Sequence, residues 1–273
     1  MFGVWRKVQA MNLDIIIGAA LNCVFFAIAL RSKTTWFTIA TLVLVVWIIY
    51  TGDRLLDTRK EGKYPNTYRH RFHKKYRPYL LTSLIVMALM ALLILPLLPL
   101  VTVVWGAGLF LMVICYFIFI VLAKQNAFIK EPVIALLYTC GVALPAVSQV
   151  GIDGRTVFLL IQHAMLAFLN LALISYYEAD EDLKSGHPSL VNIVGVKGAV
   201  RSVNFVFYGL LLSLAFFLFI YPGMFSVYIQ ATFLSMWTIL FMIKTFREYF
   251  SKFNRYRTWA DLAFWAPGWL LWL

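Results

Sequence analysis

Two short acidic segments contain the residues whose types and spacing could do chemistry. In the first, Asp53, Asp57 and Glu61 recur every four residues, and in the second Glu178 and Asp182 are again four residues apart. Residues at positions i and i+4 lie on the same face of a helix, so each segment is expected to present a stripe of carboxylates. Carboxylate oxygens suit Mg²⁺, which keeps several waters and accepts phosphate oxygens as its other ligands.

The first stripe also has a simpler explanation. Like charges four residues apart destabilise an isolated helix, and the interleaved Arg54, Arg59 and Lys60 could compensate them without a metal ion. The second stripe favours the metal, because both stripes follow an even-numbered apolar segment. Two stripes that face one another could hold Mg²⁺ and a diphosphate between them.

The elements that position these acids are predicted to be membrane-spanning helices. Hydrophobic residues make up 62% of the 273 residues and charged residues 13%, against about 45–50% and about 25% in soluble domains. The stretches 79–123 and 202–243 carry no charge, and each is long enough for two crossings of about 20 apolar residues. The sequence therefore predicts an all-α polytopic membrane protein with a single integral membrane domain over residues 1–273.

Hydropathy predicts nine transmembrane helices, arranged as two four-helix halves plus a ninth helix. They cover roughly residues 12–30, 35–52, 79–98, 100–122, 132–150, 156–177, 200–220, 223–243 and 259–273. Prolines divide the two long uncharged stretches into pairs of helices. We expect the charged loops 53–78 and 178–198 to form a cap over a candidate active site.

The basic residues predict the orientation of the bundle. There are 24 Lys and Arg against 12 Asp and Glu, a net charge of +12. If the N-terminus is cytoplasmic, every Lys and Arg except Arg31, Lys33 and Arg155 falls on that side, together with both acidic stripes. This placement accounts for the basic excess with the lipid bilayer as partner and without nucleic acid. Residues 27–29 could instead end a cleaved signal peptide, although polar residues interrupt the preceding apolar run.

The first acidic segment resembles a motif of the UbiA superfamily of intramembrane prenyltransferases, which are nine-helix bundles with two Asp-rich motifs on the cytoplasmic side. The family's first motif is Asn-Asp-x-x-Asp-x-x-x-Asp. Its four positions correspond here to Asp53, Arg54, Asp57 and Glu61. Three of the four keep an oxygen ligand, whereas Arg54 departs from the pattern.

The second acidic segment resembles the family's second motif, Asp-x-x-x-Asp followed by a glycine and Thr-Leu. Glu178 and Asp182 occupy the acid positions, Gly186 the glycine, and Ser189-Leu190 the last pair. Here Glu178 replaces an aspartate. The resemblance covers nearly the whole chain as topology, but only two short segments as motif.

The resemblance implies that the chain cleaves an isoprenoid diphosphate and transfers the prenyl group to a hydrophobic acceptor, with Mg²⁺ as cofactor. Asp53, Asp57, Glu178 and Asp182 would then be catalytic, and these four and Glu61 would hold the metal. Loss of pyrophosphate from an allylic carbon leaves an anion and a carbocation, so metal ions and cationic side chains must stabilise the anion.

Side chains that could bind the diphosphate or shield the carbocation lie near the same predicted membrane face. The candidate diphosphate-binding residues are Arg69, Arg71, Lys124 and Lys184, and each has a simpler role as a topology or lipid-headgroup charge. Aromatic faces stabilise a cation, and the candidate cavity residues are Tyr50, Tyr116, Asn170, Tyr176 and Tyr177. Asn170 has an equally good interpretation as an interhelical hydrogen-bond donor.

Three other functions remain open. A terpene cyclase of the same superfamily would share the early chemistry, with a double bond of the substrate capturing the carbocation. A transporter would be expected to place acids near the bilayer midplane beside interrupted helices, whereas here the acids crowd one face. An inactive scaffold could retain both stripes without activity.

Overall fold

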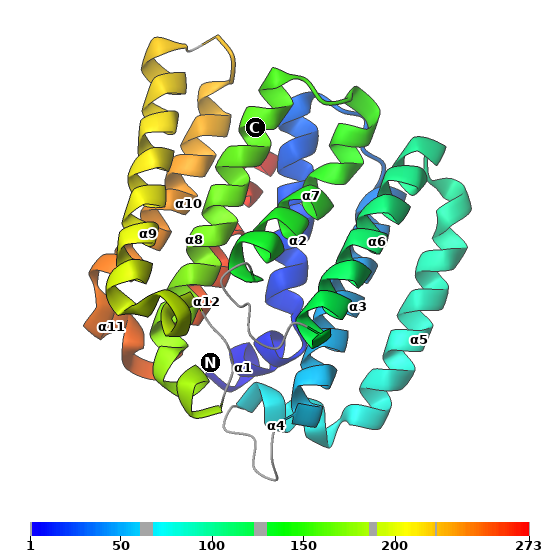
Figure 1. Cartoon of the computed structure of the whole chain (residues 1–273). Helices are drawn as coiled ribbons and strands as arrows, with labels where there is room; N and C mark the ends of the chain where they lie inside the picture. The colour runs from blue at the N-terminus through cyan, green and yellow to red at the C-terminus, as the bar shows by residue number, and fades with distance from the viewer. Residues whose placement is uncertain (1, 61–67, 123–129, 186–189, 222, 273) are drawn as a thin grey trace.

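The computed structural model is a bundle of helices (Figure 1). It describes residues 2–60, 68–122, 130–185, 190–221 and 223–272, and no strand occurs among them. Eight helices of this part are long and apolar enough to cross a membrane. They are α2 (Leu13–Leu30), α3 (Trp36–Lys60), α5 (Arg77–Ile94), α6 (Leu100–Leu122), α7 (Lys130–Val150), α8 (Gly154–Ser185), α9 (Leu190–Ala215) and α10 (Val227–Thr245). The predicted polytopic all-α fold is confirmed.

Shorter helices complete the chain. They are α1 (Phe2–Ala10), α4 (Tyr68–Lys75), α11 (Arg247–Ser251) and α12 (Arg255–Ala263), with the short turns η1 (Leu95–Leu97), η3 (Phe216–Ile220), η4 (Lys252–Asn254) and η5 (Ala266–Trp272). The helix predicted for residues 259–273 is divided into α12 and η5, so the described part has eight long apolar helices where nine were expected. Pro267 lies in η5, where its missing N–H prevents a regular helical hydrogen bond.

The long helices differ in how much of their surface is inside the bundle. In Figure 1, α2 and α8 lie among other helices, whereas α5 stands at one edge and α9 and α10 at the other. The core contains large buried side chains such as Phe26 on α2, Leu166 on α8 and Phe207 on α9. Leu80 is the one buried residue of α5, and the other apolar side chains of that helix are partly or largely exposed. Such a surface is expected of a helix that contacts lipid.

A chain of hydrogen bonds crosses the core. The amide nitrogen of Asn22 donates to the backbone carbonyls of Gly18 (2.7 Å) and Phe264 (2.8 Å), so its oxygen faces Nε2 of His163 at 3.0 Å. Nε2 therefore carries the proton, and Nδ1 accepts from the Thr139 hydroxyl at 2.9 Å. The Phe264 carbonyl follows the end of α12, where the helix leaves carbonyls unpaired. The chain thus holds the divided C-terminal segment against α2, α7 and α8.

Substitution of Asn22 by alanine should destabilise the fold. Asn22→Ala removes three buried hydrogen bonds, and such bonds contribute on average about 0.6 kcal/mol each in membrane bundles, so we expect a loss of about 2 kcal/mol. The free energy of unfolding can be measured by titrating the detergent-solubilised protein with SDS. The matched control is Asn204→Ala, because the Asn204 side chain makes no hydrogen bond with the described residues. Equal losses in the two variants would contradict the role of Asn22.

Candidate functional site

The two acidic segments continue α3 and α8 beyond their apolar parts, toward the same end of the bundle (Figure 1). Asp53 and Asp57 lie within α3, and Glu178 and Asp182 within α8, so each predicted stripe has the helical backbone that its spacing requires. The side chains of Asp57 and Asp182 and the whole of Glu61 lie outside the described structure. Asp53 and Glu178 are therefore the residues of the two stripes whose side chains the structure describes.

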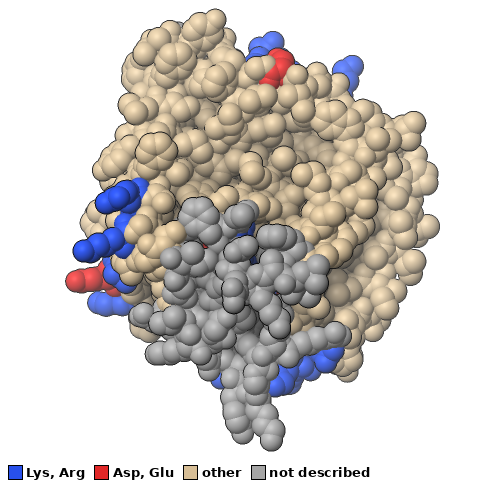
Figure 2. All heavy atoms as spheres, in the orientation of Figure 1, with Lys and Arg blue, Asp and Glu red and all other residues tan. Residues whose placement is uncertain are grey.

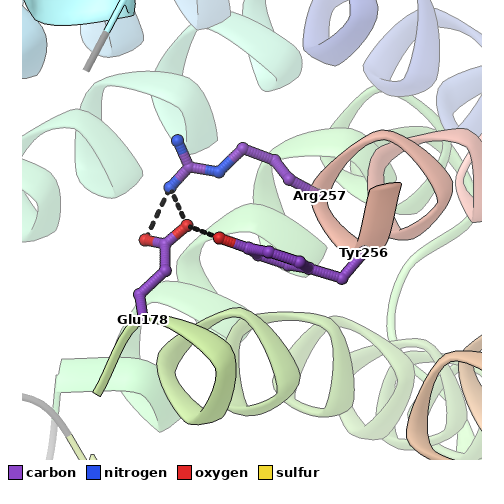
Figure 3. Close-up of polar contacts among 3 residues, drawn as sticks. All are labelled: Glu178, Tyr256 and Arg257. Atoms are coloured by element: carbon purple, nitrogen blue, oxygen red, sulfur yellow. Dashed lines mark hydrogen bonds and ion pairs between the residues drawn. The ribbon is translucent and has the colours of Figure 1, made fainter. Parts of the chain in front are cut away.

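Glu178 is bound by two residues of α12 (Figure 3). Its Oε1 accepts a hydrogen bond from the Tyr256 hydroxyl at 2.8 Å, and Nη2 of Arg257 lies 2.7 Å from both carboxylate oxygens. The side chains of Glu178 and Arg257 are 19% and 21% exposed, so the pair is largely removed from solvent. Tyr256 also stacks on Tyr177, with ring centroids 4.4 Å apart and an angle of 6°. These contacts join α8 to the C-terminal segment.

The charge of Arg257 is held by its neighbours. Burial of the guanidinium is the largest influence and by itself lowers the pKa of Arg257. The carboxylate of Glu178, together with further acidic groups nearby, outweighs burial and raises that pKa above its ordinary value. Arg257 is therefore a permanent cation in a largely buried position, as expected for arginine in a buried ion pair.

Asp14 and Asp261 connect the surroundings of both acidic segments. Their charges act on Arg257, and they also act on the hydroxyl of Tyr50, which lies about one turn before Asp53 on α3. Asp14 is fully buried in the first turn of α2. We call Asp14, Tyr50, Asp53, Glu178, Arg257 and Asp261 the polar cluster. Charged groups within membrane reach are expensive and usually mark a functional site.

Both oxygens of Glu178 keep acceptor capacity for a further ligand. A carboxylate offers about four lone-pair positions, and the hydrogen bonds from Tyr256 and Arg257 use one on Oε1 and one on Oε2. A metal ion bound by Glu178 would share the carboxylate with Arg257. Among the described residues, no group of three or more His, Cys, Asp or Glu side chains is arranged to hold a metal ion. The predicted ligands Asp57, Glu61 and Asp182 are not among those residues, because their side chains lie outside the described structure.

The predicted diphosphate-binding residues are described only in part. Arg71 is exposed on α4, a helix that contacts α3 and α1. Arg69 lies on α4 and Lys184 on α8, but their side chains are outside the described structure, as is the whole of Lys124. The described backbone thus brings α4 beside the helix that carries Asp53. The diphosphate-binding role of Arg69, Arg71, Lys124 and Lys184 stays a prediction.

The hydroxyls of the two predicted tyrosines on α8 have defined partners. The Tyr176 hydroxyl accepts a hydrogen bond from Nη1 of Arg247 at 2.9 Å, and the Tyr177 hydroxyl donates to the carbonyl of Ile243 at 2.6 Å. Burial raises the cost of breaking the second bond, because a phenol without a partner inside the bundle is unfavourable. Both hydroxyls therefore serve to position α8 against α10 and α11.

The other predicted cavity residues have separate surroundings. The amide nitrogen of Asn170 donates to the Ala260 carbonyl on α12 at 2.9 Å, which is the interhelical hydrogen bond of its alternative interpretation. Tyr50 belongs to the polar cluster and packs against the buried core. Tyr116 lies on α6, where its ring meets that of Phe117 at a centroid distance of 5.7 Å.

Sequence reasoning missed the contribution of α12 to this site. The sequence places Arg257 among the basic loop residues and predicts a transmembrane helix over residues 259–273. A signal was present, because Asp14 and Asp261 are acids within predicted apolar segments and Arg257 precedes Asp261 by four residues, the spacing of one helical face.

Comparison with known protein families, with curated proteins and with solved structures finds no match.

Proposed function

We propose that this protein is a Mg²⁺-dependent intramembrane enzyme that cleaves an isoprenoid diphosphate and transfers the prenyl group to a hydrophobic acceptor. The observation that supports this most is that the charges of Asp14 and Asp261 act both on Tyr50, one turn before Asp53, and on Arg257, which binds Glu178. Such a site can bind a charged diphosphate at its polar end and the hydrocarbon chain among the helices. The resemblance of both acidic segments to the UbiA superfamily motifs supports the same reaction.

In this proposal each acidic stripe supplies oxygen ligands. The metal ligands would be Asp53, Asp57 and Glu61 of the first stripe and Glu178 and Asp182 of the second, which together would hold Mg²⁺. When bound, the metal would supply positive charge that stabilises the departing diphosphate. Arg257 fixes the orientation of the Glu178 carboxylate through the 2.7 Å contacts with its Nη2.

Basic residues of the same end would bind the oxygens of the diphosphate. Arg69 and Arg71 on α4 are suited to it, because a guanidinium can contact two phosphate oxygens at once. Lys124 and Lys184 would add single charges. In this proposal these residues lie on the cytoplasmic side, where the segments 53–78 and 178–198, with their helical parts, would form the cap. The distribution of Lys and Arg along the sequence supports this side.

The helices would keep water away from the carbocation until it reacts. Ring faces of Tyr50 and Tyr116 could stabilise the cation. Tyr176 and Tyr177 could each offer only one ring face, because Arg247 covers the other face of Tyr176 and Tyr256 stacks on Tyr177, and the hydroxyls of both are already engaged. Asn170 would act indirectly, because its amide nitrogen is bonded to the Ala260 carbonyl. Its role is then to hold α12 and Arg257 in place beside α8.

The test is an assay of pyrophosphate release by the purified full-length protein. Geranyl, farnesyl and geranylgeranyl diphosphates are offered with Mg²⁺, with and without membrane lipid extract as a source of acceptor, and products are identified by mass. A prenylated acceptor together with pyrophosphate is expected, and EDTA should stop both. Cyclic hydrocarbons or alcohols formed without acceptor would select the terpene cyclase instead. No pyrophosphate under any condition would leave the transporter or scaffold.

A further inference from the structure

The segment between α10 and α12 gathers positive charge on an outer surface of the bundle. Lys244, Arg247, Lys252 and Arg255 lie within one short stretch, and Glu248 is its one acid. Figure 2 shows blue side chains next to a red one at the edge of the molecule where Figure 1 draws α11. No carboxylate of the described residues forms an ion pair with any of these four cations. The stretch thus carries an uncompensated positive charge.

The arginines of this stretch are held in place by aromatic rings. The guanidinium of Arg255 lies 4.5 Å from the ring centroid of Tyr249 and 5.7 Å from that of Phe253. The guanidinium of Arg247 lies 4.6 Å from the ring centroid of Tyr176 and also donates to its hydroxyl. Cations that are already ordered lose less conformational freedom when they bind an anion. The two arginines are therefore better suited to binding than mobile surface side chains.

Large apolar side chains flank these cations and face outward. Phe250 is buried and packs near Trp259 at a centroid distance of 6.4 Å, which anchors α11 to α12. Phe246, Tyr249 and Phe253 are 59%, 53% and 77% exposed. Phe253 also has a φ of 58°, a left-handed conformation that is unfavourable for a bulky residue. Contact with an apolar partner would remove the exposed rings of Phe246, Tyr249 and Phe253 from water.

We propose that the α11 surface, residues 246–255 with Lys244, binds the phosphate headgroups of anionic lipids. The surface directly follows α10, a helix that can span the membrane, so its cations lie at the depth of the lipid headgroups. Basic clusters beside a transmembrane helix attract anionic lipid, and aromatic rings partition into the interface. The exposed rings select a lipid rather than a soluble anion. This inference is independent of the proposed enzymatic function.

The experiment compares lipid binding by two variants with the same change of charge. Arg247→Gln/Arg255→Gln alters the α11 surface, and Arg31→Gln/Lys33→Gln removes two cations from the connection between α2 and α3. Figure 1 shows this connection at the end of the bundle opposite α11. The detergent-solubilised full chain is titrated with phosphatidylglycerol and with phosphatidylcholine of the same acyl chains, and bound lipid is counted by native mass spectrometry. We expect at least about tenfold weaker phosphatidylglycerol binding in the first variant, no change in the second and no change for phosphatidylcholine.

Three outcomes would overturn the inference. They are equal effects of the two double variants, equal binding of the two lipids by the parent protein, and displacement of phosphatidylglycerol by inorganic phosphate, which would indicate a site for soluble anions.

Phe253→Asn tests the aromatic part separately, because asparagine tolerates a positive φ. Its thermal stability should rise while phosphatidylglycerol binding weakens, and undiminished binding in a stable variant would contradict a role for the exposed ring.

Discussion

Asp57→Ala and Asp182→Ala should each lower the rate of Mg²⁺-dependent pyrophosphate release by about a hundredfold to a thousandfold. In the proposal, Mg²⁺ held by both stripes would contribute several kcal/mol to stabilising the leaving diphosphate, and each 1.36 kcal/mol changes a rate about tenfold. The loss of one carboxylate ligand from either stripe should remove most of this contribution. Initial rates measured across a Mg²⁺ titration should also show a midpoint displaced to higher Mg²⁺ in both variants.

Glu248→Ala is the matched control for these two variants. Glu248 is an exposed acid on α11, outside the polar cluster, and it belongs to neither stripe. Its removal should leave the rate and the Mg²⁺ midpoint unchanged, which separates the loss of a ligand from the loss of any negative charge. Parental rates in both aspartate variants would remove the metal assignment, and parental rates in one of them would confine the metal to the other stripe.

The ion pair between Glu178 and Arg257 should contribute the second largest effect, which is on stability. Breaking a buried pair costs about 3–5 kcal/mol, and because both side chains here keep about a fifth of their surface exposed, we expect about 1–3 kcal/mol for a single substitution. Arg257→Gln should cost more than Glu178→Gln. The reason is that Arg257 retains the charges of Asp14 and Asp261 when Glu178 is neutral, whereas Glu178 retains only the hydroxyl of Tyr256 among its observed partners.

A double-mutant cycle measures this pair directly. The free energies of unfolding of the parent, both single variants and Glu178→Gln/Arg257→Gln are compared by SDS titration. Residues in contact show coupling energies of about 0.5–3 kcal/mol, so the double variant should lose less than the sum of the two single losses. Tyr256→Phe serves as a smaller reference, since it removes the hydrogen bond to Glu178 without changing a charge. Additive losses in the cycle would show that the pair contributes no net coupling.

The extent of the two acidic helices follows directly from residue spacing. The apolar part predicted at 35–52 continues as α3 through Lys60, and that predicted at 156–177 continues as α8 through Ser185. Acids at i and i+4 require a helix to share one face, and both backbones provide it. Hydropathy predicted the positions of the other long helices for a related reason, because one crossing of the bilayer needs a run of apolar residues with its backbone hydrogen bonds satisfied internally.

The C-terminal segment does not form the single transmembrane helix that its hydropathy predicts. Residues 259–273 have the apolar composition of a spanning helix, yet they form the end of α12 and the short turn η5, in which Leu271 and Trp272 are exposed. Composition indicates how favourably side chains transfer into lipid. It contains no information about which helix supplies a hydrogen-bond donor to a backbone carbonyl that is left unpaired at a helix end. The Phe264 and Ala260 carbonyls are paired by Asn22 and Asn170, which are distant from them in the sequence. Those partners exist only after the helices have packed.

The sequence by itself determined which eight helices are apolar enough to lie in a bilayer and on which helical face the acids of α3 and α8 lie. Both properties depend on the order of neighbouring residues. Only the tertiary structure decided that Arg257 pairs with Glu178, that Asp14 and Asp261 act on both Tyr50 and Arg257, and that Asn170 bonds to α12 rather than being left to a cavity. Contacts between distant segments depend on helix rotation and packing, and spacing along the chain constrains neither.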